Sequence, residues 1–216
     1  MSLQPKRARF TPIALATGLI AAGLLSLSMT GTLSGFVASI TNSSNTAATG
    51  AIVMEETTTT GTLATCTSTD SGTVSVNAST CSSINTFGGS TVMVPGTQVT
   101  TGITIKNTGT VTPSSFTMTH GTSCIQSNNG ALNGTATDLC SKINIVITSG
   151  STTVFTGTVA QLALATTTTT PAITMPAAPA AGIGAPFSIT ATLDSDAGNT
   201  YQGLAVSLPI TFTFTS

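Results

Sequence analysis

Apolar and polar residues alternate along several short segments of this chain, which is the pattern of half-buried β-strands. The clearest segment runs from Gln98 to Lys106, where Val99, Ile103 and Ile105 alternate with polar residues. Further alternating segments, separated by turn-forming residues, predict additional strands. These segments carry Phe116 and Met118; Ile143, Ile145 and Ile147; Val154 and Phe155; Phe187, Ile189, Ala191 and Leu193; and a closing strand with Val206, Leu208, Ile210, Phe212 and Phe214.

Weaker alternation predicts further strands in the first half of the chain. They are Phe36–Thr41, Thr46–Met54 with Ile52 and Met54 facing inward, and a hairpin of Thr62–Cys66 with Thr73–Asn77. Pro95-Gly96, Asn107–Gly109 and Ser149–Ser151 are typical of turns. We interpret Cys124–Cys140 as a polar loop that ends in one helical turn near Asp138. Thr166–Pro186 reads as an exposed loop, because its prolines cannot donate to a strand ladder.

The composition favours the same fold class. Among 216 residues, 48 are Thr and 25 are Ser, whereas Lys, Arg, Asp and Glu together make up 5%. Branched β-carbons favour strands, and the scarcity of Glu, Lys and Arg argues against a helical bundle. We therefore predict an all-β, two-sheet sandwich. We expect one domain over residues 46–216, which is long enough for a single core.

The amino terminus is typical of an export signal. Lys6, Arg7 and Arg9 precede an uncharged apolar stretch from Ile13 to Met29, and small residues follow it. We predict an export helix and signal peptide over residues 1–34, with cleavage leaving Gly35 as the new terminus. The alternative is an uncleaved anchor. Both readings place the rest of the chain outside the membrane, so secretion to the extracellular space or cell surface is expected, with membrane contact only through the signal segment.

Charge excludes one class of partner. After residues 1–34 the chain keeps only Lys106 and Lys142 against six acidic residues, a formal charge of −4. A chain this poor in cations cannot displace counterions from a nucleic acid. Its neutral surface, covered with hydroxyl groups, suits contact with water, sugars or copies of itself.

The four cysteines agree with export. Cys66, Cys81, Cys124 and Cys140 are even in number and contain no Cys-x-x-Cys pair, which favours disulfides in an oxidising compartment. Of the three possible pairings we favour Cys66–Cys81 and Cys124–Cys140, because each pair brackets a short polar segment. Loops of about 15 residues would each contribute roughly 3 kcal/mol in the chain-entropy treatment. Zinc binding is disfavoured by the spacing and by the single histidine.

Four segments resemble the TasA and camelysin family, in the order found in that family. They are GTLSGFVASITNSSNTAATGAIVME at Gly31–Glu55, PGTQVTTGITIKNTGT at Pro95–Thr110, KINIVITSGSTTVFTGTVAQLA at Lys142–Ala163 and GNTYQGLAVSLPITFTFT at Gly198–Thr215. The resemblance covers most of Gly31–Ser216. It has no counterpart for Thr57–Ser90, the Cys124–Cys140 segment or the Ala- and Pro-rich loop.

The resemblance implies a jelly-roll sandwich, release by a SipW-type signal peptidase and assembly into extracellular filaments. In such filaments the amino-terminal strand of one subunit completes a sheet of its neighbour. The matching segment here is short, uncharged and alternating, and the linker Asn42–Asn45 follows it. We expect the donor strand to consist of Gly35, Phe36, Val37, Ala38, Ser39, Ile40 and Thr41. The alternatives are that this segment pairs within its own domain or is the tail of the signal.

The family also carries a metallopeptidase label, for which this chain lacks the residues. A zinc peptidase needs several ligands and a general base, as in His-Glu-x-x-His. The only histidine is His120, and the only glutamates are Glu55 and Glu56. No Gly-x-Ser-x-Gly elbow accompanies His120. We therefore expect no enzymatic activity and no cofactor, and we interpret His120 as a turn residue at a strand end.

Two smaller signals complete the prediction. Asp194, Asp196, Gly198 and Asn199 resemble part of a calcium loop, but the terminal glutamate is missing, so a turn is favoured. Asn42, Asn77 and Asn133 lie in Asn-x-Ser/Thr sequons. The sequence thus favours a self-assembling fibre subunit over a monomeric surface-binding module, and it favours both over a secreted protease.

Overall fold

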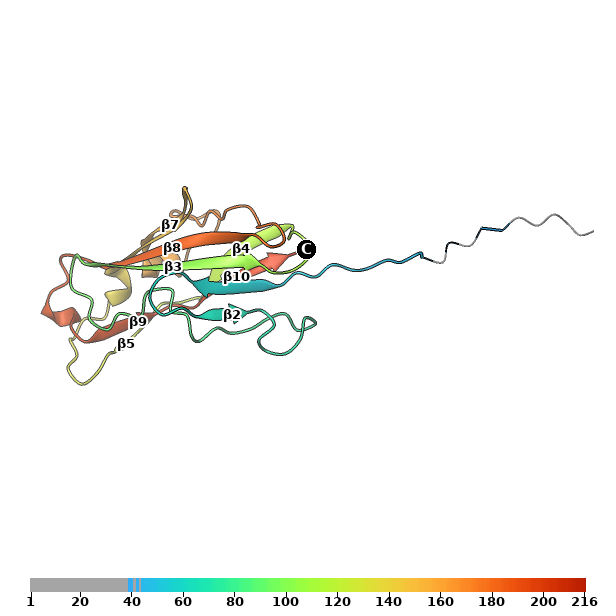
Figure 1. Ribbon diagram of the computed structural model, residues 1–216. Coiled ribbons are helices and arrows are strands. Elements are labelled where there is room, and N and C mark those ends of the chain that lie inside the picture. Colours follow the sequence, from blue (N-terminus) through green and yellow to red (C-terminus); the bar gives the residue numbers. More distant parts are fainter. Residues whose placement is uncertain (1–38, 41, 43) are drawn as a thin grey trace, which may run out of the picture. The chain divides into compact units, whose positions relative to one another are not determined.

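The computed structural model describes residues 39–40, 42 and 44–216 (Figure 1). Residues Ala48–Ser216 form one compact unit, and the residues before Ala48 belong to a separate unit. The predicted export helix, residues 1–34, lies outside the described residues, as do positions 35–38 and 41 of the predicted donor strand. Ser39 and Ile40 are described; both are exposed and neither lies in a strand.

Six antiparallel strands form the main sheet of the compact unit, in the order β2-β1-β3-β8-β6-β7. Their bounds are β1 (Met54–Thr58), β2 (Thr65–Thr67), β3 (Gln98–Asn107), β6 (Ile143–Ser149), β7 (Thr152–Thr158) and β8 (Gly184–Leu193). The strands predicted around Ile103, Ile145 and Ile189 are confirmed. The alternating residues of β8 face the core, since Phe187, Ile189, Ala191 and Leu193 are all buried.

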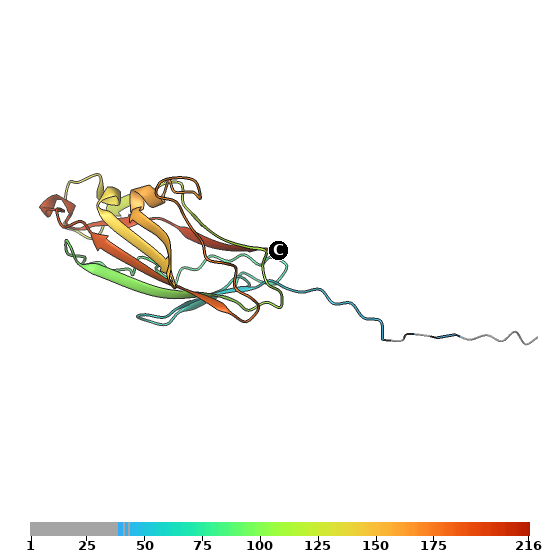
Figure 2. The ribbon, with the colours of Figure 1, turned by 90° about the horizontal axis from the view of Figure 1, so that it is seen from above.

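The second layer is a ribbon only two strands wide. β4 (Ser115–His120) pairs with β10 (Ile210–Thr215), and β5 (Ile125–Asn128) pairs with β9 (Leu204–Ser207). Because β4 leads into β5 and β9 into β10, the two pairs form one interrupted ribbon along the domain (Figure 2). The ring of Phe116 in β4 packs on that of Phe187 in β8 with centroids 5.9 Å apart. The predicted all-β two-layer sandwich is confirmed, with a narrow second layer.

The core lies between the ribbon and the main sheet. Ile103, Ile105, Ile145 and Ile147 supply its centre and are at most 1% exposed. The register between β6 and β7 shifts after Ile147, and this bulge inserts one extra residue into β7. Val154 and Phe155 are therefore both buried although they are adjacent in sequence.

The predicted turn after β3 is built around a buried side chain. Asn107 is fully buried; its Nδ2 donates to the carbonyl oxygens of Val111 (2.9 Å) and Pro179 (3.2 Å), and its Oδ1 accepts from Gly109 N (3.0 Å). Gly109 leaves room for the incoming chain, because a Cβ there would lie 2.3 Å from the carbonyl oxygen of Ala51. The Asn-Thr-Gly turn thus holds three segments together.

Three strand predictions are wrong in detail. The strand predicted over Thr46–Met54 is not formed, and β1 starts only at Met54, because the carbonyl oxygens of Ala51 and Val53 accept hydrogen bonds from the β3–β4 loop instead of joining a ladder. Thr73–Asn77 forms a turn, so β2 pairs with β1. The closing strand is divided into β9 and β10 at Leu208-Pro209, since proline supplies no N–H to continue the ladder.

The Cys124–Cys140 segment also contains more structure than predicted. It holds β5, which the sequence pattern missed because its side chains are mostly polar. The predicted helical turn near Asp138 is confirmed as the short helix η1 (Leu139–Ser141), with Asp138 at its N-cap position. A further short helix, η2 (Asn199–Tyr201), precedes β9.

The Thr166–Pro186 segment is not simply an exposed loop. Ile173 and Pro179 are buried, and Thr174 N donates to the carbonyl oxygen of Val154 on β7 (2.9 Å). The segment therefore covers the outer edge of the main sheet, a position that proline tolerates. Pro186 itself belongs to β8, at a point where only β3 flanks it, since β6 pairs from Ser188 onward.

The short helix α2 (Val159–Leu162) leads into this segment and was not predicted. Thr158 and Gln161 form a capping box at its start: Gln161 N donates to Thr158 Oγ1 (3.2 Å) and Thr158 N donates to Gln161 Oε1 (2.8 Å). The spacing Thr-x-x-Gln is the sequence signal that could have located it.

Candidate functional site: a groove beside the unpaired edge of β10

β10 has a strand neighbour on one side only among the described residues. It pairs with β4 from Ile210↔His120 to Thr215↔Ser115. An unpaired strand edge is a template for adding another strand. Every strand of the two-stranded ribbon has such an edge, and the outer edge of β10 is one that could recruit an extended peptide.

The inward-facing side chains of β10 are less buried than those of β4. Phe116 and Met118 of β4 face the main sheet and are 6% and 5% exposed. Phe212 and Phe214 of β10 face the same way, with the Phe212 ring 5.2 Å from that of Phe187, yet both are only half-buried. Two strands of one layer thus differ in burial on the same face, although each has one strand neighbour.

The phase of the β4–β10 ladder shows which backbone groups are free. Gly121 N donates to the carbonyl oxygen of Pro209 (2.9 Å), and ladder bonds alternate along an antiparallel pair. Thr211 and Thr213 therefore direct their backbone groups toward β4. Ile210, Phe212 and Phe214 direct theirs toward the open edge.

A groove of about 800 Å³ runs beside this open edge. We call it the β10 groove. One wall comes from β9 and β10, and the other from β1, β2 and the segment that follows Cys81. Its larger apolar lining residues are Ile52, Met54, Ile84, Phe87, Ile125, Val206, Leu208, Ile210, Phe212 and Phe214.

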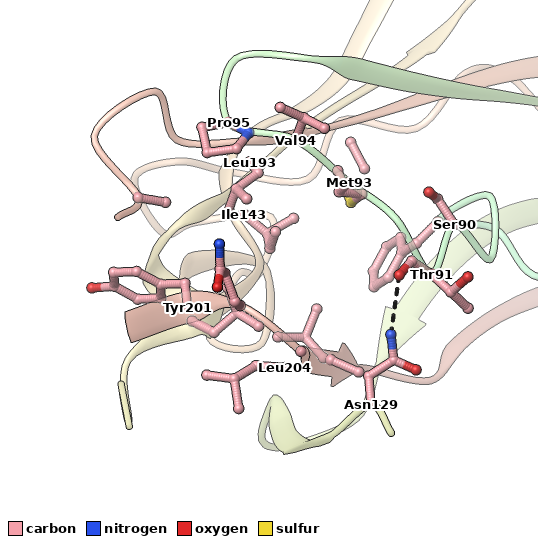
Figure 3. A pocket seen from close by; sticks show the side chains of 18 of the residues that line it. Ser90, Thr91, Met93, Val94, Pro95, Asn129, Ile143, Leu193, Tyr201 and Leu204 are labelled. Carbon is pink, nitrogen blue, oxygen red and sulfur yellow. Dashed lines mark hydrogen bonds between the residues drawn. The ribbon is translucent and has the colours of Figure 1, made fainter. Parts of the chain in front are cut away.

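A second cavity of about 500 Å³ continues the groove toward β9, and the two share Asn85, Phe87 and Val206. Residues 85–95, which we call the strap, form one side of this strap pocket, and Leu204 of β9 forms the other (Figure 3). Met93 points inward, and Asn129 Nδ2 donates to the carbonyl oxygen of Thr91 (3.2 Å) across the mouth. Ile143 and Leu193 form the floor, so the pocket reaches the core.

The strap contains no strand and is loosely attached. Gly88 and Gly89 both have positive φ (83° and 61°), which glycine adopts without a steric cost. Val92 and Val94 are exposed, 80% and 60% respectively. Met93 and the Asn129 bond are thus the main attachments of its middle part to the ribbon.

Among the residues that the structure describes, Glu56 is the one ionisable side chain that lines the β10 groove, apart from the disulfide-bonded cysteines. It lies opposite Ile105 in the sheet, so its side chain is on the core face of β1. No hydrogen bond or ion pair joins its carboxyl group to another described residue. Burial raises the pKa of the Glu56 carboxyl above its usual range.

We expect Glu56→Gln to raise the melting temperature at pH 7. The pKa is higher in the folded protein than in the unfolded chain, so ionisation costs stability. That cost is absent below the ordinary glutamate pKa of about 4.3, grows as pH rises and is complete above the folded pKa. Thermal unfolding at pH 7 and near pH 3 should therefore show a gain for Glu56→Gln only at pH 7.

Glu55→Gln is the matched control. Glu55 lies on the opposite face of β1, where its cross-strand neighbour on β3 is Lys106. The cross-strand neighbour of Glu56 on β2 is Cys66, which is in a disulfide and carries no charge. The control should show no gain at pH 7. A Glu56→Gln variant that unfolds at the wild-type temperature at both pH values would contradict the assignment.

Both favoured cysteine pairings are confirmed. Cys66 is bonded to Cys81 and Cys124 to Cys140, with Cα atoms 5.8 Å and 6.1 Å apart. The first disulfide lines the β10 groove and fastens the chain before the strap to β2. The second closes the loop that contains β5.

His120 lies at the end of β4, as predicted, next to Gly121. Its Nδ1 is 2.9 Å from the carbonyl oxygen of Gly121, and its Nε2 is 2.6 Å from that of Ala165. Both ring nitrogens thus face backbone carbonyls. In this arrangement the histidine connects β4 to the chain after α2.

The remaining candidate residues form local structure. Asp194 Oδ1 accepts from Asp196 N (2.9 Å) in a turn, and its Oδ2 is 3.7 Å from Lys142 Nζ. Across residues 39–40, 42 and 44–216 no three His, Cys, Asp or Glu side chains are grouped to hold a metal ion. Asn77 Nδ2 donates to the carbonyl oxygen of Ile52 (2.7 Å), and Asn133 Nδ2 donates to that of Gly130 (2.8 Å).

No protein-family model matches the chain, and no curated protein matches it. In the part of the chain that is described, no helix has the length and apolarity required to cross a membrane.

Proposed function

We propose that this protein is the subunit of an extracellular filament, in which Gly35–Thr41 of one copy adds a strand to β10 of the next. The observation that carries the proposal is the unpaired edge of β10 beside the β10 groove, with Phe212 and Phe214 left half-buried. A strand added there satisfies the free backbone groups of β10 and covers those two rings.

The proposed donor matches the groove in length and pattern. Seven residues of strand span roughly 23 Å, and the six residues of β10 span roughly 20 Å. Phe36, Ala38 and Ile40 fall on one face, suited to the apolar groove, while Val37, Ser39 and Thr41 fall on the other. Burying Phe36 and Ile40 would contribute about 1.5–3 kcal/mol each before ordering costs.

The sequence supports the cellular setting of this proposal. The signal-like residues 1–34 and the four segments that resemble the TasA and camelysin family point to export and assembly. Two disulfides are typical of oxidising compartments. We therefore place the filament outside the cell, with other copies of the chain and the signal peptidase as its partners.

Electron microscopy of negatively stained secreted protein tests the proposal, using two charge substitutions in β10. Phe214→Lys places an ammonium group in the groove, whereas Thr213→Lys places one on the exposed outer face. We expect Phe214→Lys to reduce filament mass at least tenfold and Thr213→Lys to leave it unchanged. Circular dichroism of both variants checks that they are folded.

Two results would contradict the proposal in different ways. Filaments from the folded Phe214→Lys protein, equal in amount to wild type, would show that the groove is not the acceptor. Monodisperse wild-type protein at all concentrations would refute assembly itself.

The strap pocket favours one alternative function, a monomeric surface module that binds a neutral ligand. The amides of Asn85, Asn129, Asn199 and Gln202 and the ring of Tyr201 line it, and no charged side chain of the described part of the chain does. Such a lining could hydrogen-bond to hydroxyl groups. Monodisperse wild-type protein whose thermal stability rises with added sugars would support this alternative.

A further inference from the structure

The compact unit begins at the end of the sandwich where β10 finishes. Thr110 N donates to the carbonyl oxygen of Ala51 (2.8 Å), which places the incoming chain on the β3–β4 loop. Ser114 N, in the same loop, donates to the carbonyl oxygen of Thr215 (2.7 Å). The incoming chain and the carboxyl end of β10 are therefore both next to this loop. We call this the loop end of the domain.

The position of the loop end restricts the direction of a donated strand in a filament. If a donor entered its neighbour's groove at the loop end, the two loop ends would meet and each chain could fill the other's groove. That exchange is isologous and closes into a dimer. An open filament requires a head-to-tail contact, so the donor enters at the β9 end and its amino terminus reaches the loop end. It then runs antiparallel to β10.

Glu56 lies close to the loop end of the groove. It is two residues along β1 from Met54, which pairs with Asn107 at the start of the β3–β4 loop. Two residues of strand correspond to about 7 Å. The amino terminus of an antiparallel donor therefore arrives at the part of the groove that contains this carboxyl group.

A cationic partner would keep Glu56 ionised once a strand covers it. Its carboxyl group already lies on the core face, without a hydrogen bond or ion pair to any described residue, and covering a lone carboxylate is costly. The chain has no Lys or Arg between Arg9 and Lys106. The α-ammonium group at a cleaved terminus is therefore the only cation that a donor from this region can bring.

We infer that Glu56 binds the free α-ammonium group of the donor strand from the neighbouring copy. This inference rests on the proposed function and specifies its chemistry. Before cleavage, Gly35 carries an uncharged amide nitrogen bonded to Ser34; after cleavage it carries an ammonium group. Glu56 thus discriminates processed donors from unprocessed chains, so that removal of the signal creates the group that the acceptor recognises.

Two peptides test this inference directly. Both have the sequence Gly35–Asn45 with a fluorophore at the carboxyl end; one has a free amino terminus and the other is acetylated. Each is titrated against the mature chain, residues 35–216, at a concentration at which it remains monomeric, and fluorescence anisotropy reports binding. We expect the free-amine peptide to bind at least tenfold more tightly than the acetylated one.

Two substitutions in β1 test whether Glu56 is responsible for the preference for the free amino terminus. Glu56→Gln should reduce the tenfold preference to less than twofold, and Glu55→Gln, on the opposite face of β1, should retain it. Equal binding of the two peptides to wild type, or a preference that survives in Glu56→Gln, would overturn the inference while leaving strand donation intact. Failure of both peptides to bind wild type would overturn the proposed function, and the inference with it.

Discussion

Removal of Gly35–Thr41 from the mature chain is expected to abolish filaments and leave a folded monomer. We expect the core to form without this segment, because all the paired strands and the buried cluster found among the described residues lie in the compact unit Ala48–Ser216. The shortened chain keeps its acceptor groove but has no strand to offer. Electron microscopy should show no filaments, and light scattering should give the mass of one chain.

Substitutions within the donor provide a matched comparison of equal length. Phe36→Ser removes a side chain from the face expected to fill the groove, whereas Val37→Ser changes the opposite face. The first should reduce filament mass strongly and the second only slightly. Normal filaments from the chain lacking Gly35–Thr41 would show that assembly uses another surface.

Asn107→Ala is expected to produce the largest loss of stability among single substitutions of polar residues in this domain. The change leaves the carbonyl oxygens of Val111 and Pro179 and the amide of Gly109 without their side-chain partner. Unsatisfied buried groups cost about 1–3 kcal/mol each, and their effects are not additive. We expect about 3 kcal/mol in total and a melting temperature lower by about 6–12 °C.

Asn128→Ala is the corresponding control, because Asn128 is an exposed asparagine on β5. Its melting temperature should stay within about 2 °C of wild type, the range typical of surface substitutions. Thermal denaturation followed by circular dichroism measures both variants. An Asn107→Ala protein as stable as the control would mean that the turn does not depend on the buried amide.

The alternating pattern predicted the strands well where one face is fully buried. β3, β6 and β8 have this property, and their isoleucines and Phe187 form the core. It failed for β5, which lies at the edge of the ribbon with mostly polar side chains. The pattern also predicted β9 and β10 as one strand. The alternation of apolar and polar residues continues through Leu208-Pro209, whereas the ladder hydrogen bonds are interrupted there.

The sequence predicted the donor strand of the candidate site but not the acceptor groove. The apolar alternation of Phe36, Ala38 and Ile40 indicated a donor strand, but nothing local indicated the acceptor. The β10 groove is assembled from segments about 150 residues apart, such as Met54 and Phe212. Likewise, Glu56 attracted notice only as one of two glutamates, because its position beside Ile105 depends on the pairing of β1 with β3.

The amino-acid sequence by itself determined the all-β class and the central strands and favoured the correct pairing of the cysteines, because these depend on periodicity and on short separations along the chain. Only the tertiary structure decided that the second layer stops at β10 and that a carboxyl group faces the space beside it. Those features follow from which strands pair across long separations, and side-chain patterns alone do not specify that choice.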